Sequence, residues 1–244
     1  MEDSTGRLKP SGLVLITGAT DSSKSRIARG LIDMILYEEW KEYVERRKEN
    51  EKARKPHLLT YEDPIEEKWI EQVELFANHP LQGGDRNRSN AFYLSNRSGP
   101  DYTPRQKDSD VKNLPLAVDD ALRQTPAVMY IGEVRNVGDW KSVLKVAGTG
   151  HLVVATSHAG SITEALNVLM RQLKVTNPAL RSEFIEKICA VIHIRPHYLG
   201  GQRALIPSLW RRTNRGVKDF VSDGLSSLLP NWFEVPKSGA IGKG

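Results

Sequence analysis

The chain has 244 residues, a formal net charge of +5 at pH 7 and a pI of about 9.2. Hydrophobic residues make up 39% and charged residues 27%, which is typical of a globular domain and excludes a mainly disordered chain. Cys189 is the only cysteine, which excludes a disulfide scaffold, and no apolar run approaches the roughly 18 residues of a membrane-spanning helix. The modest positive charge permits contact with an acidic partner without requiring one.

The length predicts one main domain. We expect a short leader at 1–11, the main domain at 12–215, and a helix with a loose tail at 216–244. The first ten residues are polar and lack the apolar stretch of a secretory signal, so the sequence favours the cytosol.

Apolar runs alternate with helical patterns along most of the chain. Short runs rich in Val, Ile and Leu predict buried strands, in chain order at 13–17, 57–64 (with an acidic turn at its end), 127–133 and 151–158. Apolar residues spaced three or four positions apart predict helices at 26–55, 116–124, 136–150 and 161–174. This alternation predicts a mainly parallel α/β sheet flanked by helices.

Later features complete the predicted fold. The runs CAVIHIRPHYL and QRALIPSLW, separated by Gly200 and Gly201, predict an antiparallel hairpin at one edge of the sheet. A last amphipathic helix is expected at 218–230, and residues 66–115 have the Gly, Asn, Asp and Pro content of a long loop. The charged part of the first helix, at 38–54, is expected to be a solvated extension or else a docking surface for a partner.

The segment GATDSSKS, residues 18–25, lies where a phosphate-binding loop belongs, after a buried strand and before a helix. In the motif G-x-x-x-x-G-K-[ST], backbone amides surround phosphate oxygens, the lysine reaches the phosphates and the hydroxyl binds Mg²⁺. Gly18, Lys24 and Ser25 match the motif, whereas Ser23 takes the place of the second glycine. The alternative interpretation is a strand–turn–helix junction in which Lys24 and Ser25 are incidental.

Asp21 is the more serious departure from the motif, because it adds a carboxylate to a loop that would bind a polyanion. Two charges about 4 Å apart interact by about 4 kcal/mol at an effective dielectric constant of ~20. We therefore expect Asp21 to weaken binding unless its side chain points outward. Ser23 adds a second concern, because the glycine that it replaces often has a backbone conformation that side chains disfavour.

Chemically active side chains follow three of the predicted strands, and the carboxyl ends of parallel strands face the ligand crevice of such folds. Glu62 and Asp63, in YEDP, are candidates for orienting water or a metal ion. Glu133, in MYIGEVR, has the position of a Walker B acid, and His158, after HLVVATS, is placed to sense a γ-phosphate. The respective alternatives are a solvated turn, a strand-end ion pair and a packing histidine; His151, at the opposite strand end, is expected to be structural.

Together, GATDSSKS, TYEDPIE, YIGEVR and TGHLVVATSHAGS resemble the ordered motifs of the type II/type IV secretion ATPase superfamily, nearest to its PilT-type pilus-retraction and DotB-type secretion ATPases. The resemblance implies a RecA-like P-loop NTPase fold and the ligands ATP and Mg²⁺. It implies that Glu62, Glu133 and His158 are catalytic and that Ser25 and Glu133 hold the metal. The implied nucleotide-binding residues are Gly18, Ala19, Thr20, Asp21, Ser22, Ser23, Lys24, Ser25 and Arg26.

The resemblance also implies partners. Members of the family form hexameric rings, so it implies a homo- or hetero-hexamer that acts on an inner-membrane platform, with the chain cytoplasmic and peripheral to the membrane. Arg123, Arg135 or an arginine within 86–105 would complete a neighbouring subunit's site. The family's N-terminal domain is missing before the first strand, which indicates a truncated chain, a split subunit completed by a separate chain, or a degenerate paralogue.

Two functional hypotheses follow, and a third is disfavoured. The first is an ATP-hydrolysing motor subunit of a secretion or type IV pilus system. The second is a regulatory or structural paralogue with impaired nucleotide binding, suggested by Asp21 and Ser23 and by the family's glycines at those positions. A nucleic-acid translocase is disfavoured, because the basic residues are scattered and no aromatic–basic stacking surface is evident in the sequence.

Overall fold

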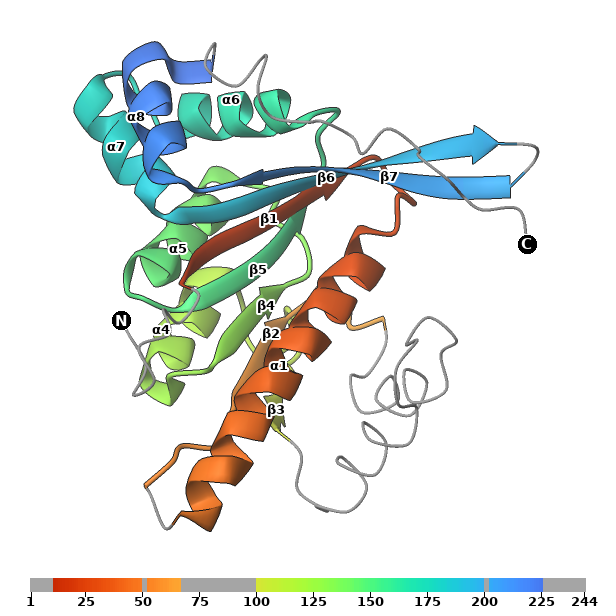
Figure 1. Cartoon of the computed structure of the whole chain (residues 1–244), viewed down its shortest axis with the longest axis vertical. Helices are drawn as coiled ribbons and strands as arrows, with labels where there is room; N and C mark the ends of the chain where they lie inside the picture. Colours follow the sequence, from red (N-terminus) through yellow and green to blue (C-terminus); the bar gives the residue numbers. More distant parts are fainter. Residues whose placement is uncertain (1–10, 50–51, 67–99, 200–201, 226–244) are drawn as a thin grey trace. The chain divides into compact units, whose positions relative to one another are not determined.

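The computed structural model describes residues 11–49, 52–66, 100–199 and 202–225 (Figure 1). They belong to two compact units. The first unit runs up to Ala28 and resumes at Glu133, and the second runs from Arg29 to Gly132. The helix α1 (Lys24–Lys48) begins in the first unit and continues in the second.

The first unit contains a four-stranded sheet with the order β5-β1-β6-β7. Its strands are β1 (Gly12–Gly18), β5 (Leu152–Ser157), β6 (Ile188–Leu199) and β7 (Gln202–Arg211). β1 pairs in parallel with both β5 and β6, and all seven of its residues are buried, as expected for a strand between two neighbours. β6 and β7 form a long antiparallel ribbon (Figure 1).

The ribbon carries exposed apolar side chains. Leu205 and Leu209 of β7 are exposed large apolar residues, and they alternate with the exposed Arg203 and Arg211. β7 is the last strand of its unit's sheet and contains Pro207, which suits an edge position because proline cannot donate a backbone hydrogen bond.

Four helices of the first unit each begin at a polar cap residue whose side chain accepts a backbone hydrogen bond. The caps are Asn136, Ser161, Asn177 and Thr213, and the helices are α5 (Val137–Gly148), α6 (Ile162–Gln172), α7 (Pro178–Glu186) and α8 (Asn214–Asp223). α5 contacts β1 and β5, while α6 and α7 contact β6. α7 and α8 contact each other, and the Phe184 and Phe220 rings lie 6.4 Å apart.

The second unit contains a three-stranded parallel sheet with the order β3-β2-β4. Its strands are β2 (His57–Tyr61), β3 (Asp101–Thr103) and β4 (Val128–Ile131). The helix α4 (Leu114–Gln124) begins at the cap Asn113 and contacts β2. On α1, Trp40 is buried, and the Lys55 ammonium lies over its ring, 5.8 Å from the ring centroid.

The predicted fold class is confirmed: the strands are mainly parallel, helices flank them, and β6 and β7 form the antiparallel pair at an edge. Within the described residues, none of the helices combines the length and apolar character needed to cross a bilayer. The division into 1–11, 12–215 and 216–244 stays a prediction.

Several element boundaries differ from prediction. β3 falls within the expected loop, because a three-residue edge strand is too short to leave a pattern. α7 was not predicted, although Asn177–Pro178 is a helix-start signal. α1 ends at Lys48 instead of 55, and α8 begins at Asn214, because Thr213 caps it, instead of 218. Residues 67–99 of the expected loop, Gly200, Gly201 and the end of the last predicted helix lie outside the described residues.

Candidate functional site

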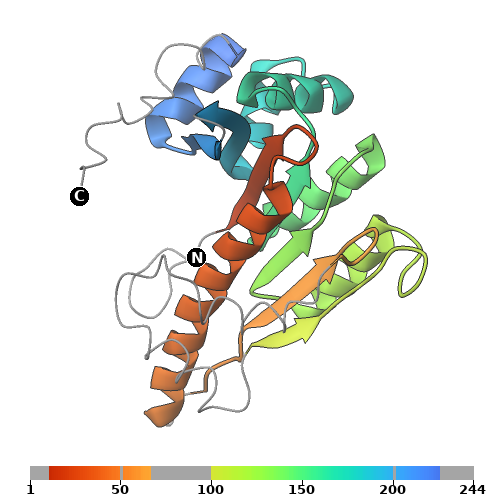
Figure 2. The ribbon, with the colours of Figure 1, turned by 90° about the vertical axis from the view of Figure 1, so that its right-hand side faces the viewer.

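The loop between β1 and α1 is built on close backbone contacts, and its path can be followed in Figure 2. A Cβ atom added at Gly18 would lie 2.5 Å from Ser22 Oγ and 2.6 Å from the Ile194 carbonyl oxygen. No side chain fits in that space, so glycine is required where the strand turns into the loop. Ser22 is fully buried, and its Oγ makes no hydrogen bond within the described part of the chain.

Asp21 and Ser23 have left-handed backbone conformations, with φ values of 59° and 63°. Glycine adopts this region freely, whereas other L-residues lose roughly 1–2 kcal/mol there, with aspartate among the more tolerant. The expected strain at Ser23 is thus present, and Asp21 shares it. Asp21 is exposed.

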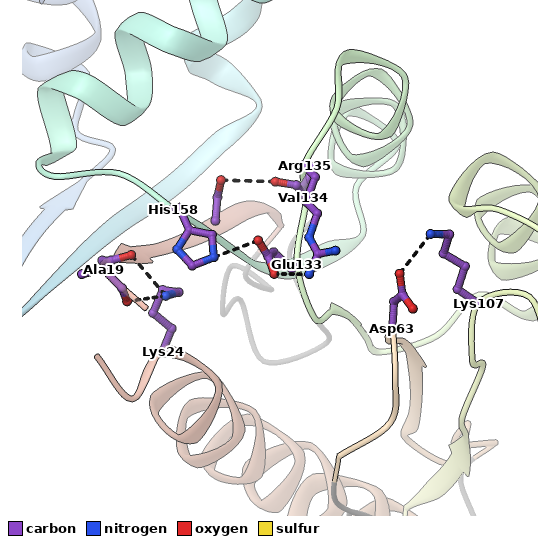
Figure 3. A network of polar contacts seen from close by, with 10 residues as sticks. Ala19, Lys24, Asp63, Lys107, Glu133, Val134, Arg135 and His158 are labelled. Carbon is purple, nitrogen blue, oxygen red and sulfur yellow. Dashed lines mark hydrogen bonds and ion pairs between the residues drawn. The ribbon is translucent and has the colours of Figure 1, made fainter. Parts of the chain in front are cut away.

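Lys24 places its ammonium group inside this loop. Its Nζ donates hydrogen bonds to the carbonyl oxygens of Gly18, at 3.1 Å, and Ala19, at 2.6 Å (Figure 3). Burial lowers the pKa of Lys24, while the negative charges of Glu133 and Asp21 act in the opposite direction. The loop therefore holds a largely buried cation next to carbonyl groups that a phosphate would displace.

Glu133 and His158 are in direct contact. His158 Nε2 lies 2.9 Å from Glu133 Oε1, and Arg135 donates to Glu133 Oε2 at 2.9 Å (Figure 3). Burial acts to raise the pKa of Glu133, but the hydrogen bond and charge of Arg135, helped by His158 and Lys24, lower it below its ordinary value. Glu133 is therefore an ionised carboxylate at neutral pH.

The backbone around Glu133 is fixed to the end of β5. Val134 donates from its N–H to the Thr156 carbonyl at 2.9 Å, and Ser157 Oγ donates to the Val134 carbonyl at 3.3 Å. These bonds explain why Glu133 and His158, which are 25 residues apart by number (158 − 133), meet. His158 is 48% exposed on its side chain, so it is not the packing histidine of the alternative interpretation.

Two contacts of the loop were not predicted. The buried His193 of β6 has its Nδ1 3.0 Å from Thr17 Oγ1, immediately before Gly18, and burial lowers the pKa of His193 so that the neutral ring is favoured. Arg203 of β7 donates to the Asp21 backbone carbonyl. Both contacts join positions more than a hundred residues apart, so no local pattern could have found them.

In the second unit, Glu62 is buried and pairs with Arg29. Arg29 donates to Glu62 Oε2 at 3.1 Å, and the Glu62 backbone is fixed by bonds to the Arg105 carbonyl and the Lys107 N–H, each 3.0 Å. The solvated-turn interpretation therefore fits Asp63, which is exposed and 3.0 Å from Lys107 Nζ (Figure 3), but not Glu62.

The remaining predicted residues have simple environments. Ala19, Thr20 and Arg26 are exposed, and Ser25 is half-buried in the first turn of α1. His151 lies before β5, with its Nδ1 3.0 Å from Thr149 Oγ1. Arg135 is bound to Glu133 of its own chain and Arg123 is exposed on α4, while only 100–105 of the segment 86–105 is described. Which arginine completes a neighbouring site stays a prediction.

The residues of the loop fit a phosphate group and its metal ion. The Lys24 ammonium and the loop amides can donate hydrogen bonds to phosphate oxygens, while the Ser25 hydroxyl and the Glu133 carboxylate offer the hard oxygen ligands that suit Mg²⁺. Across the described ranges, no three His, Cys, Asp or Glu side chains gather in a metal cluster. A magnesium ion would therefore depend on phosphate oxygens and water for most of its ligands, which is its usual arrangement with nucleotides.

The chain is similar in sequence to known proteins over most of its length. The family model for type II/IV secretion system proteins matches residues 5–194. The type IV pilus ATPase PilU of Pseudomonas aeruginosa is 30% identical over 155 residues, covering 64% of this chain and 30% of PilU. The pilus retraction ATPase PilT of the same organism is 27% identical over 198 residues, covering 80% of this chain and 45% of PilT. The chain thus spans less than half the length of these two relatives.

Solved structures share the fold. The crystal structure of the pilus retraction motor PilT with bound ADP superposes with a TM-score of 0.66 at 22% identity, over 89% of this chain and 52% of that one. The Legionella pneumophila ATPase DotB gives a TM-score of 0.62 at 20% identity, over 89% and 51%. At 22% and 20% sequence identity, these two structures show that the fold is shared.

Proposed function

Because this chain belongs to the type II/IV secretion system protein family, we propose that it is an ATP-binding motor subunit of a secretion or type IV pilus machine. The observation that carries the proposal is Lys24, whose ammonium is held inside the loop by the Gly18 and Ala19 carbonyls. The similarity to PilU and PilT, both named pilus ATPases, supports ATP as the ligand. Residues 12–215 are proposed to be the ATPase domain.

The proposed binding mode uses Lys24 and the start of α1. The loop amides and the N-terminus of a 25-residue helix attract phosphate oxygens, since the helix dipole adds positive potential there. When phosphate enters, Lys24 exchanges its two carbonyl bonds for charge-assisted bonds to the ligand. Gly18 to Arg26 form the proposed cradle, and Ser25 and Glu133 would hold Mg²⁺, which would neutralise part of the phosphate charge.

Hydrolysis is proposed to proceed by in-line attack of water on the γ-phosphate, with the chain supplying position and charge. Glu133 is ionised, so it can orient the water and accept its proton. His158 contacts Glu133 and is proposed to respond when the γ-phosphate leaves. Glu62 is the second candidate for polarising the water.

A second candidate function is a regulatory or structural paralogue with impaired nucleotide binding. The left-handed Asp21 and Ser23, together with the Asp21 charge close enough to influence Lys24, favour this candidate. Titration with a fluorescent ATP analogue in Mg²⁺, followed by a phosphate-release assay, separates the two. Saturable binding with turnover supports the motor, whereas no binding at millimolar analogue supports the paralogue.

The proposed assembly follows the family. We propose a homo- or hetero-hexamer that works in the cytoplasm against an inner-membrane platform, with a separate chain as one source of the N-terminal domain. Arg123, Arg135 or an arginine of 86–105 is proposed to complete the neighbouring site. Nucleic acid is not a proposed partner; salt-sensitive retention on single-stranded DNA would contradict that.

Replacing Asp21 and Ser23 by glycine is expected to tighten binding of a nonhydrolysable ATP analogue by about tenfold, or about 1.4 kcal/mol. The double variant removes a negative charge from the loop and lets both positions adopt positive φ freely. Calorimetric titration measures the effect. Asp21→Asn is the matched control, because asparagine tolerates the left-handed region but carries no charge. Unchanged affinity in the double variant would mean that the loop accommodates both side chains.

A further inference from the structure

A buried group of charges joins α1 to the end of β2 within the second unit. Arg29 is 3% exposed and Glu62 is 5% exposed, and their ion pair is 3.1 Å long. Asp33 follows Arg29 by one helical turn, and its Oδ2 is buried without a hydrogen bond in the described part of the structure. Arg29 is thus paired with Glu62 and lies close enough to Asp33 for its charge to act on that carboxyl. We call these three residues, Arg29, Asp33 and Glu62, the Arg29 cluster.

The Arg29 cluster lacks enough positive charge for both acids. If both carboxylates were ionised, these three side chains would carry a net charge of −1, with Arg29 and Glu62 buried and Asp33 half-buried. Burial raises the pKa of Asp33 to about 7, against the charge of Arg29, which lowers it. Burial also raises the pKa of Glu62, again opposed by Arg29. Each acid therefore depends on the same cation for its ionised form.

Among the residues that the structure describes, the other groups around Glu62 do not replace that cation. Thr60 of β2 offers a hydroxyl close enough to lower the pKa of Glu62, although Glu62 Oε1 has no hydrogen bond of ordinary geometry among the described residues. Glu66 adds a second negative charge that raises it. Lys107 is half-buried and pairs with Asp63. After β4, Gly132 brings backbone only, and a Cβ there would lie 3.3 Å from Glu62 Cγ.

We propose that Arg29 is a positioning residue that keeps the buried Glu62 carboxylate ionised and fixed, and that Asp33 competes with Glu62 for the same guanidinium. The consequence for turnover rests on the proposed function, in which Glu62 is a candidate for polarising water. A general base must be ionised to act, so the pH at which Glu62 loses its charge sets the acid limit of the activity that depends on it. Arg29 lowers the pH at which Glu62 loses its charge, and Asp33 raises that pH.

The test is a direct titration of Glu62 in the whole chain by carbon NMR of glutamate side-chain carboxyls, assigned with Glu62→Gln. Arg29→Met is expected to move the Glu62 midpoint upward by about one pH unit or more, since an opposite charge at this distance shifts a carboxyl by that amount. Arg29→Lys should recover part of the shift. Asp33→Asn should move the midpoint downward, because it removes a competing negative charge beside Arg29. Arg47→Met, an exposed position on the same helix, is the matched control.

The pH dependence of ATP turnover provides a second measurement. In the same variants, the acid limb of the kcat profile should move in the same direction as the Glu62 midpoint, while KM for ATP stays constant. A purely structural role would lower kcat at every pH without moving the limb. If Arg29→Met does not fold, the other two variants still test the proposal: Arg29→Lys should move the Glu62 midpoint upward, and Asp33→Asn should move it downward.

The outcomes separate this inference from the proposed function. A Glu62 midpoint that stays in place in folded Arg29→Met or Arg29→Lys, and in Asp33→Asn, overturns the inference. If the midpoints move as expected but Glu62→Gln keeps full turnover, the control of Glu62 by Arg29 stands and only its catalytic consequence fails.

Discussion

Lys24→Ala is expected to raise the dissociation constant for ATP by at least about a hundredfold and to bring phosphate release to background. The Lys24 ammonium is the buried cation of the loop between β1 and α1. A unit charge about 4 Å from a phosphate is worth about 4 kcal/mol at an effective dielectric constant of ~20, and every ~1.4 kcal/mol is tenfold in affinity. Titration with a fluorescent ATP analogue and a phosphate-release assay measure the two effects.

The control for this variant is Lys141→Ala, which removes an exposed lysine from α5. It lowers the net charge by the same amount, so it reports any general electrostatic effect on binding. Thermal unfolding of both variants checks that the loss of the Gly18 and Ala19 bonds has not unfolded the chain. Retention of affinity within threefold in folded Lys24→Ala would place the nucleotide away from this loop, and the motor proposal would be lost.

Glu133→Gln is expected to lower kcat by about 10²–10⁴-fold, the usual range for removing a general base, while ATP binding changes only a few-fold. Glutamine keeps the size of the side chain but cannot accept a proton as a carboxylate does. Single-turnover phosphate release, compared with analogue binding in the same preparation, measures the separation of chemistry from affinity.

The matched control is Glu183→Gln. Glu183 is also a carboxylate in an ion pair, 2.7 Å from Lys187 Nζ, and the hydrogen bond with that lysine lowers its pKa, but it lies on the exposed surface of α7. Only the Glu133 variant should lose turnover. If Glu133→Gln keeps a third or more of the wild-type kcat, Glu133 is not the base and Glu62 becomes the leading candidate.

The pH dependence distinguishes the two glutamates. The folded-state pKa of Glu133 lies below the ordinary value of a glutamate, so its ion pairs stabilise the fold above that ordinary value and this stability is lost as the pH falls through the lowered pKa. Glu133 therefore stays ionised across the neutral range. Burial raises the pKa of Glu62, which is the opposite direction, so an acid limb above the ordinary range of a glutamate would point to Glu62 and the Arg29 cluster.

Much of the fold was predictable because its strands are uniform. The run LVLIT at 13–17 is almost wholly apolar and rich in β-branched residues, which suits a strand buried on both faces, and it forms most of β1. The contact between Glu133 and His158 was foreseeable in outline, since each follows a predicted strand. The sequence likewise located the loop at 18–25, because a phosphate loop needs a strand before it and a helix after it.

The rest depends on tertiary contacts that have no local pattern. Nothing near Arg29 in the sequence indicates that it faces Glu62, which is 33 positions away (62 − 29). The same holds for Arg203 at the Asp21 carbonyl and for His193 beside Thr17. The left-handed conformation of Asp21 could be guessed only from the family, because aspartate is acceptable in several backbone regions.

The β6–β7 ribbon affects the solubility of the chain. Between Ile188 and Thr213 the sequence has four arginines and no Asp or Glu, so two copies brought edge to edge repel each other. That repulsion protects Leu205 and Leu209, which would otherwise favour self-association. Because mobile ions shorten the range of surface charge to about 8 Å at physiological ionic strength, this protection weakens as salt increases, and concentrated stocks should stay clear longest in dilute buffer.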